Sequence, residues 1–294
     1  MSFIKTKSKT RVLGLALGSG GARGMAHVGV LRALREADLE PDVIAGTSAG
    51  SIVAAAYASN RLNVLEQLAE VLDWRLVAKL FFEFGFKKDG LLRGTRIMQF
   101  LGEIIPAEDF GALRIPTAIV ATDLENETEV VFQSGSVHHA IRASIAIPGV
   151  FTPVSHEGRL LADGGLVNPV PVSAARALGA TNVIAVDINT STMNGSKMLP
   201  LQSQGEKPPS LFTILTRSFR LYENTITRAQ LRQSPPDILV APPVGHIPTL
   251  DFLHAREAIS AGYHATLEAL GNNHRQEFPP SGGAYCPCSV RKGI

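Results

Sequence analysis

Short apolar runs alternate with longer amphipathic segments along most of the chain. Runs of strand length, rich in β-branched and aliphatic residues, occur at 11–17, 42–45, 116–122, 129–133, 159–163, 182–188 and 237–242. Segments with helical spacing occur at 25–37, 49–59, 64–74, 95–105, 136–145, 172–179 and 211–231. Strands that alternate with helices are typical of a mainly parallel sheet covered on both faces. The pattern therefore predicts a three-layer α/β/α fold.

Length and composition indicate one large domain followed by a tail. The chain has 294 residues, of which 45% are hydrophobic and 18% charged, enough to bury a sizeable core. We expect the domain to span residues 1–270, with a mobile surface loop at about 189–210, where Gly, Pro and Ser are frequent. Residues 271–294 are expected to form a poorly ordered tail.

Charge and cysteine content narrow the possible partners and location. The formal net charge is +2, and no basic cluster indicates nucleic-acid binding. Cys286 and Cys288 are too close together for an ordinary stapling disulfide and too few for a zinc site, which suggests a reducing compartment. Residues 1–18 resemble a secretory signal, but the apolar part is short and leads directly into a glycine-rich loop, so we expect a cytoplasmic protein.

The first candidate for chemistry is the sequence GSGGARG, residues 18–24, between a predicted strand and a predicted helix. Its glycines permit positive φ and leave backbone N–H groups unshielded, and the helix dipole adds partial positive charge. Such a loop suits negative charge, for example a dinucleotide pyrophosphate. However, the spacing of Gly18, Gly20 and Gly24 departs from the dinucleotide fingerprint, and no acidic residue ends the second strand. A glycine turn that only allows close packing is a further interpretation.

The second candidate is GTSAG, residues 46–50, which has the form G-x-S-x-G between strand-like and helix-like residues. In this pattern a strained turn exposes the serine hydroxyl at the end of a strand, here Ser48. The alternative is that Ser48 only caps the following helix. The glycine loop and the elbow follow strands at one edge of the predicted sheet, and acyl transfer needs both a nucleophile and oxyanion donors.

A serine nucleophile needs a base, and the sequence favours a carboxylate over histidine. None of the histidines late in the chain lies in a persuasive catalytic context. These are His246, His254, His264 and His274. His27 is expected to be a hydrogen-bonded core residue. Asp163 follows an apolar run in RLLADGG, so its carboxylate is expected at the same edge as the two loops. It is deprotonated at neutral pH, and partial burial would raise its pKa toward that of a useful base. A structural Asp-Gly turn is the alternative.

The glycine loop, the elbow and the later DGG, in this order, resemble the patatin-like phospholipases, α/β acyl hydrolases with a Ser–Asp dyad. The resemblance covers residues 11–188 and is expected to extend over the whole domain to about Leu270. The stretches GMAHVGVLRALRE and GLVNPVP also resemble the small bacterial members of the family, and the resemblance implies a patatin-like fold. It further implies that Ser48 is the nucleophile, Asp163 the base, and that no metal or other cofactor is needed. The implied oxyanion donors are Gly20 and Gly21, with supporting roles for Arg23, Gly46, Gly50 and Gly164. Ser19 is a departure, because many relatives carry glycine there.

An aromatic segment, residues 73–92, bears on the substrate. Ahead of Lys87 and Lys88 it holds Trp74, Phe81, Phe82, Phe84 and Phe86. These rings suit either peripheral contact with a membrane or a lid packed inward. Together with the resemblance, the segment favours phospholipid or lysophospholipid esters as substrates. Two alternatives stay open, namely a dinucleotide-binding oxidoreductase that uses GSGGARG, and a regulatory protein of low turnover that retains the fold.

Overall fold

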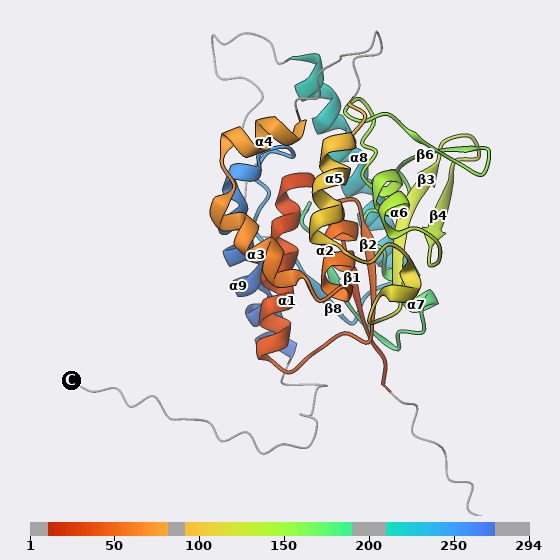
Figure 1. Cartoon of the computed structure of the whole chain (residues 1–294). Helices are drawn as coiled ribbons and strands as arrows, with labels where there is room; N and C mark the ends of the chain where they lie inside the picture. The colour runs from red at the N-terminus through yellow and green to blue at the C-terminus, as the bar shows by residue number, and fades with distance from the viewer. Residues whose placement is uncertain (1–10, 82–91, 190–209, 274–294) are drawn as a thin grey trace, which may run out of the picture.

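A central sheet lies between helices in the computed structural model, which describes residues 11–81, 92–189 and 210–273 (Figure 1). Its strands are β1 (Leu13–Leu17), β2 (Val43–Thr47), β3 (Thr117–Asp123), β4 (Thr128–Phe132), β5 (Val154–His156), β6 (Arg159–Asp163), β7 (Asn182–Val186) and β8 (Ile238–Val240). All except β5 coincide with apolar runs of the sequence. The sequence analysis missed the short β5. This strand is defined by its pairing with β6 in a hairpin, and no apolar run marks it in the sequence.

The helices are α1 (Ala26–Glu36), α2 (Ala49–Ala58), α3 (Leu62–Val71), α4 (Trp74–Phe81), α5 (Thr95–Ile104), α6 (Val137–Ser144), α7 (Val172–Ala177), α8 (Leu211–Gln233) and α9 (Ala255–Asn273). Short 3-10 turns are η1 (Gly21–Met25), η2 (Phe110–Ala112), η3 (Gly164–Leu166) and η4 (Phe252–His254). The sequence predicted one helix over 64–74, but α3 ends at Val71 and α4 begins at Trp74. The break occurs where Asp73 Oδ1 accepts a hydrogen bond from the Leu76 N–H (2.8 Å) and so caps a new helix.

Successive residues of the inner strands point to opposite faces of the sheet. In β1, Leu15 and Leu17 belong to the core shared with α1 and α2, whereas Ala16 belongs to the core shared with α7. Larger side chains thus fill one face and smaller ones the other. Strands β1, β2, β3, β7 and β8 pair in parallel. The expected α/β/α fold with a mostly parallel sheet is confirmed.

Strands β2 and β6 share one edge of β3. The other edge of β3 pairs with β4 over residues 119–123. On the shared edge, β2 pairs with residues 117–120 and β6 with residues 121–123, so the ends of the two strands meet. Asp163 does end its strand, as predicted, but β6 runs antiparallel to β3 because it is the return strand of the hairpin with β5.

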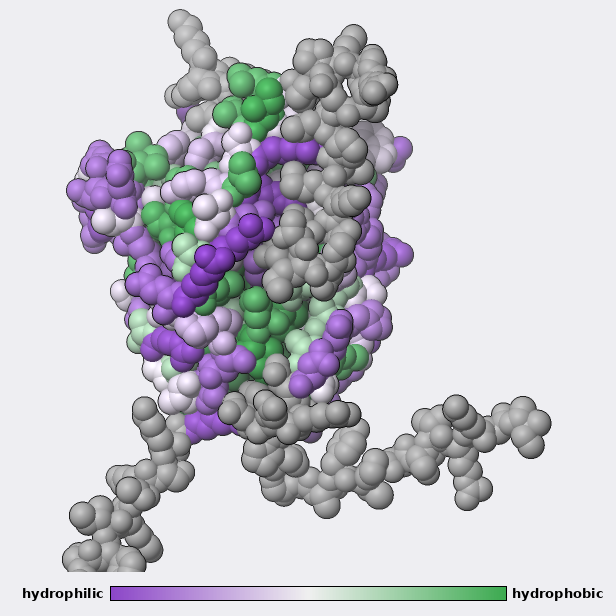
Figure 2. Space-filling model, turned by 180° about the vertical axis from the view of Figure 1, so that it is seen from behind, coloured by the Kyte–Doolittle hydropathy of each residue, from purple (hydrophilic) through white to green (hydrophobic). Residues whose placement is uncertain are grey.

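Outside the sheet, one end of the molecule carries α4 and the first turns of α8 (Figure 1). From behind, Figure 2 shows a hydrophobic patch at this end. None of the helices in the described ranges combines the length and apolar composition needed to cross a bilayer. Most of the predicted mobile loop and tail, 190–209 and 274–294, lies outside the described residues.

Candidate active site

Ser48 lies at the sharp turn between β2 and α2. Its backbone has φ 53° and ψ −120°, a conformation that residues other than glycine rarely adopt. Side chains at Gly46 and Gly50 would collide with backbone carbonyl oxygens, so glycine is needed on both sides of the turn. The Ser48 N–H donates to Ser144 Oγ (2.8 Å), while the Ser48 side chain makes no capping bond to α2. The turn therefore leaves the hydroxyl available to another partner.

That partner is Asp163. The Ser48 hydroxyl donates to Asp163 Oδ2 across 2.6 Å, and the two residues are only 3% and 1% exposed. Asp163 Oδ1 accepts from the Gly165 N–H (2.8 Å). Thr122 Oγ1 donates to the Asp163 carbonyl oxygen (2.7 Å). The carboxylate is thus fixed from its backbone and from its far oxygen, with the near oxygen facing the serine.

Burial raises the pKa of Asp163 from 3.8 to about 7, although the hydrogen bonds from Ser48 and Gly165 oppose this rise. Near neutral pH the side chain can therefore exist in both protonation states. The ionised form can accept a proton from Ser48, and the protonated form can return one. Such a pKa suits a group that acts first as a base and then as an acid.

The glycine-rich loop reaches the same place. Gly21 and Ser48 line one cavity. At Gly21 φ is 59°, and a side chain would collide with the Thr249 carbonyl oxygen, so only glycine suits this close approach.

Two amides of the loop hold it in place, and two others stay available. Gly18 N–H donates to Val186 O (3.0 Å) and Ser19 N–H donates to Pro169 O (2.8 Å). Among the backbone–backbone hydrogen bonds of the described residues, none has the N–H group of Gly20 or Gly21 as its donor. Their use as oxyanion donors remains a prediction.

A buried polar network lies beneath the loop. Arg23, 1% exposed, donates to Asn189 Oδ1 (2.7 Å) and to Ile247 O (3.1 Å), which ties the loop to the segments after β7 and β8. Burial lowers the pKa of Arg23 to about 9. Ser19, the departure noted in the sequence, donates from its hydroxyl to Glu223 Oε1, and Asn189 Nδ2 donates to Glu223 Oε2 (3.1 Å).

Sequence reasoning did not find Ser144, Asn189 or Glu223. Burial, with a smaller contribution from the nearby Asp163, raises the pKa of Glu223 to about 8. Two carboxyl groups in one buried region do not both ionise readily near neutral pH. Glu223 is the only acidic residue of α8, a signal that the sequence does contain.

The histidines lie elsewhere in the described structure. His246 Nε2 contacts Glu257 Oε1 (2.6 Å) on the surface, and His254 pairs with Asp251. His27 is buried and contacts Gly18 O through Nε2 (2.8 Å), and burial lowers its pKa to about 4, so it stays neutral. Among the hydrogen bonds of the described residues, none joins a histidine to Ser48, and His274 lies outside those residues.

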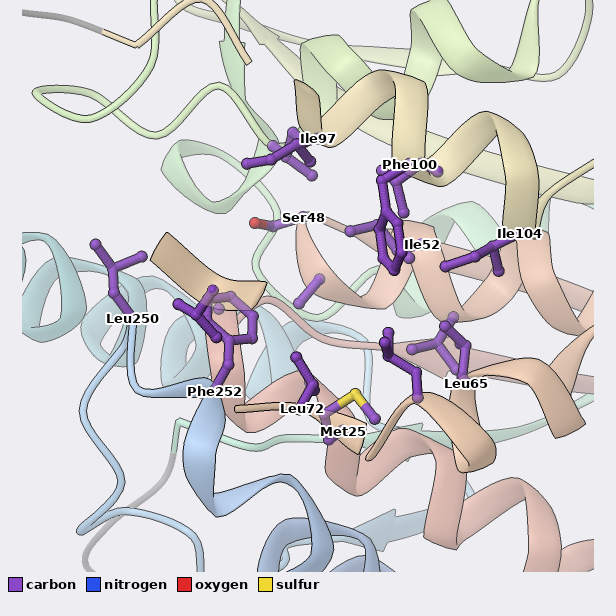
Figure 3. A pocket seen from close by; sticks show the side chains of 18 of the residues that line it. Met25, Ser48, Ile52, Leu65, Leu72, Ile97, Phe100, Ile104, Leu250 and Phe252 are labelled. Carbon is purple, nitrogen blue, oxygen red and sulfur yellow. The ribbon is translucent and has the colours of Figure 1, made fainter. Parts of the chain in front are cut away.

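An apolar cavity of about 150 Å³ opens beside Ser48. Figure 3 shows side chains of α5 on one side of it, and Leu65, Leu72 and Met25 on another. Leu250 and Phe252 lie on the left of the view, the side toward which the Ser48 hydroxyl points. A cavity lined in this way suits an unbranched apolar chain.

The aromatic segment is described only in part. Phe82, Phe84, Phe86, Lys87 and Lys88 lie outside the described residues. Phe81 ends α4, but the placement of its side chain is not described. Val77 of the same helix lines the cavity, so α4 contributes to the cavity wall.

A family model described as patatin-like phospholipase matches residues 15–176, more than half of the chain and including all three motifs. An uncharacterized NTE family protein of Mycobacterium tuberculosis is 42% identical over 188 residues, which cover 64% of this chain and 52% of that protein. Lysophospholipase NTE1 of Pyricularia oryzae is 29% identical over 283 residues, which cover 88% of this chain and 18% of that protein.

The solved structure of VipD from Legionella pneumophila covers 89% of this chain and 67% of VipD, with a TM-score of 0.47 and 12% identity. The chain spans about half the length of the mycobacterial relatives. The family match over residues 15–176 agrees with the resemblance that the three motifs indicate. The chain therefore belongs to the patatin-like phospholipase family.

Proposed function

We propose that this chain is a serine lipid acyl hydrolase, of the phospholipase A, lysophospholipase or esterase type. The observation that carries the proposal is the 2.6 Å hydrogen bond from Ser48 to Asp163 at the wall of an apolar cavity. A lysophospholipase among the relatives supports a lipid ester as the substrate class. The strained backbone of Ser48 supports a nucleophile, because such strain is retained where function requires it.

In the first half of the reaction, Asp163 Oδ2 takes the hydroxyl proton while Ser48 Oγ attacks the ester carbonyl carbon. The carbonyl oxygen becomes an oxyanion, for which the N–H groups of Gly20 and Gly21 are the proposed donors. One such donor typically contributes about 3 kcal/mol. The tetrahedral intermediate collapses, its C–O bond to the alcohol breaks, and protonated Asp163 gives the proton to the leaving alkoxide. The acyl group stays on Ser48.

In the second half, water replaces the alcohol. Asp163, ionised again, takes a proton from water, and the hydroxide attacks the acyl carbon. The Ser48–acyl bond then breaks, and Asp163 returns the proton to Ser48 Oγ. A pKa of about 7 permits both roles within one cycle.

The cavity is the proposed site of the acyl chain. A cavity of about 150 Å³ with a Leu/Ile/Phe lining binds a molecule the size of benzene. The cavity beside Ser48 therefore has room for an acyl chain of about six carbons. A longer chain has to extend beyond this cavity.

Fluorophosphonate labelling of the wild type, Ser48→Ala and Asp163→Asn tests the assignment. The wild type is expected to be labelled at Ser48, Ser48→Ala not at all, and Asp163→Asn far more slowly. Ester turnover is expected to follow the same order. Label at another residue, or an unchanged rate in Asp163→Asn, would refute the dyad.

The same samples separate the alternative functions. A dinucleotide-binding oxidoreductase would bind nicotinamide cofactors in a titration without labelling of Ser48. A regulatory protein of low turnover would be labelled at Ser48 but would hydrolyse every ester in a screen of chain lengths only slowly.

A further inference from the structure

Helix α8 carries polar residues on its inner face and apolar residues on its outer face. Arg220, Glu223 and Thr227 are buried against the domain. The exposed apolar side chains are Leu211 (71%), Ile214 (45%), Leu215 (48%), Leu221 (69%) and Tyr222 (48%). At 3.6 residues per turn, these five residues occupy an arc of about 120°. This outer stripe reverses the arrangement usual for a helix on the surface of a globular protein.

Buried hydrogen bonds fix α8 in this orientation. Arg220 donates to Gly245 O (2.8 Å), and Glu223 accepts from Ser19 and Asn189. Farther along, Gln230 Nε2 donates to Val167 O (2.6 Å). Rotating the helix to bury the outer stripe would break these bonds and leave Ser19, Asn189 and the Gly245 carbonyl oxygen buried without these partners. The stripe is therefore a stable feature of the surface.

The stripe adjoins the cavity beside Ser48. A Cβ placed on Gly149 would lie 3.8 Å from Leu215 Cδ1, so Leu215 packs against the loop that includes Gly149. Ile147 and Phe151 of the same loop line the cavity. Helix α4 and the first turns of α8 lie at the same end of the molecule (Figure 1). Figure 2 shows the hydrophobic patch at this end. Trp74 of α4 is also exposed.

Cations accompany the apolar residues at this end. The described stretches 73–81, 92–104 and 210–222 contain two acidic residues, Asp73 and Glu103. Besides the buried Arg220, their basic residues are Arg75, Lys79, Arg93, Arg96 and Arg217. A combination of apolar side chains and positive charge suits an anionic lipid surface. It does not suit a second copy of this chain, because two such faces would bring like charges together.

We infer that the outer stripe of α8 docks onto the surface of an anionic phospholipid bilayer. The docked helix would hold the loop of Gly149, and with it the cavity beside Ser48, close to the lipid. That the same lipid is the substrate rests on the proposed function. Docking itself needs no catalysis.

Binding to vesicles tests this inference with the full chain carrying Ser48→Ala, so that no lipid is consumed. Vesicles of phosphatidylcholine with phosphatidylglycerol are expected to bind the protein, and phosphatidylcholine alone or high salt to reduce binding. Adding Leu211→Glu with Leu221→Glu, the two most exposed leucines of the stripe, is expected to lower the partition coefficient by at least about tenfold. The matched control adds Leu160→Glu with Leu267→Glu, exposed leucines on β6 and α9, and is expected to bind within about twofold of the parent.

Several results would overturn the inference. The first is that the protein does not bind anionic vesicles. The second is that the substitutions in α8 leave vesicle binding unchanged, and the third is that the control pair reduces binding as much as the α8 pair does. A dimer in sedimentation velocity that only the α8 pair dissociates would make the stripe a contact between copies. Hydrolysis of a soluble short-chain ester, measured with Ser48 restored, should be unchanged in both pairs. If vesicle binding depends on α8 as stated but no variant hydrolyses any ester, the docking surface stands and the proposed function fails.

Discussion

Replacing Asp163 by asparagine is expected to slow turnover strongly and to stabilise the fold at alkaline pH. Asp163 is 1% exposed, and burial raises its pKa from 3.8 to about 7. The folded state thus opposes ionisation by roughly three pKa units. At 1.36 kcal/mol per unit, the ionised carboxylate destabilises the fold by about 4 kcal/mol above pH 7.

Proton binding determines whether the free energy of unfolding rises or falls with pH. Between pH 4 and 7 the folded protein keeps a proton on Asp163 that the unfolded chain has lost, so the free energy of unfolding falls as the pH rises. Asparagine is neutral at every pH, so the variant lacks the part of this fall in stability that Asp163 causes. Asp163→Asn is therefore expected to exceed the wild type by roughly 2–4 kcal/mol at pH 8, and to match it at about pH 4. The nearby Glu223 acts in the same direction, because a neutral residue 163 no longer raises its pKa.

Urea unfolding at pH 4 and pH 8 measures the difference, and Ser48→Ala is the matched control. Both variants are expected to lose most or all of the activity, but Ser48→Ala keeps the buried carboxylate and so keeps the decline of stability with pH. No gain for Asp163→Asn at pH 8, or a gain of the same size at pH 4, would refute the reasoning.

Other predictions concern rate, substrate and the buried network. Turnover of a soluble ester is expected to rise through about pH 7 and to fall about tenfold per unit below it, because Asp163 must be ionised; an inflection that disappears in His246→Ala would contradict this. Phe100→Ala enlarges the cavity and is expected to shift kcat/KM toward acyl chains a few carbons longer; an unchanged chain-length profile would show that chains bind elsewhere. Glu223→Gln is expected to keep most of the activity at pH 7, where the native carboxyl is largely protonated, whereas Glu223→Ala leaves its buried donors unpaired and should cost about 1–3 kcal/mol in urea unfolding. Equal effects of the two Glu223 changes would refute that distinction.

The local motifs could be predicted from sequence because their chemistry is local. Glycines around Ser48 and along residues 18–24 indicate tight turns wherever the rest of the chain lies. The elbow and the glycine loop follow parallel neighbours, β2 and β1, so their proximity follows from the strand pattern. The apolar run before Asp163 likewise predicts a strand that ends at the carboxylate.

Other features depend on pairing and tertiary burial, which periodicity does not encode. The direction of β6 is set by its hairpin with β5, a strand too short to predict. The period of α8 predicts a helix but not which face is buried, and the usual assumption would place its leucines inside. The partners of Glu223, namely Ser19 and Asn189, lie more than 30 residues away in sequence. Such a network is visible only once the fold is known.

The meeting of Ser48 and Asp163 depends on β3, a strand that contributes neither residue. Thr47 pairs with Val120, and Asp163 pairs with the next residue, Ala121. A slip of β6 by one position would turn the carboxylate to the other face of the sheet. Thr122 opposes such a slip by its hydrogen bond to the Asp163 carbonyl oxygen. Because strand register fixes both residues, the geometry of the proposed dyad is a property of the sheet and not of flexible side chains reaching across a cleft.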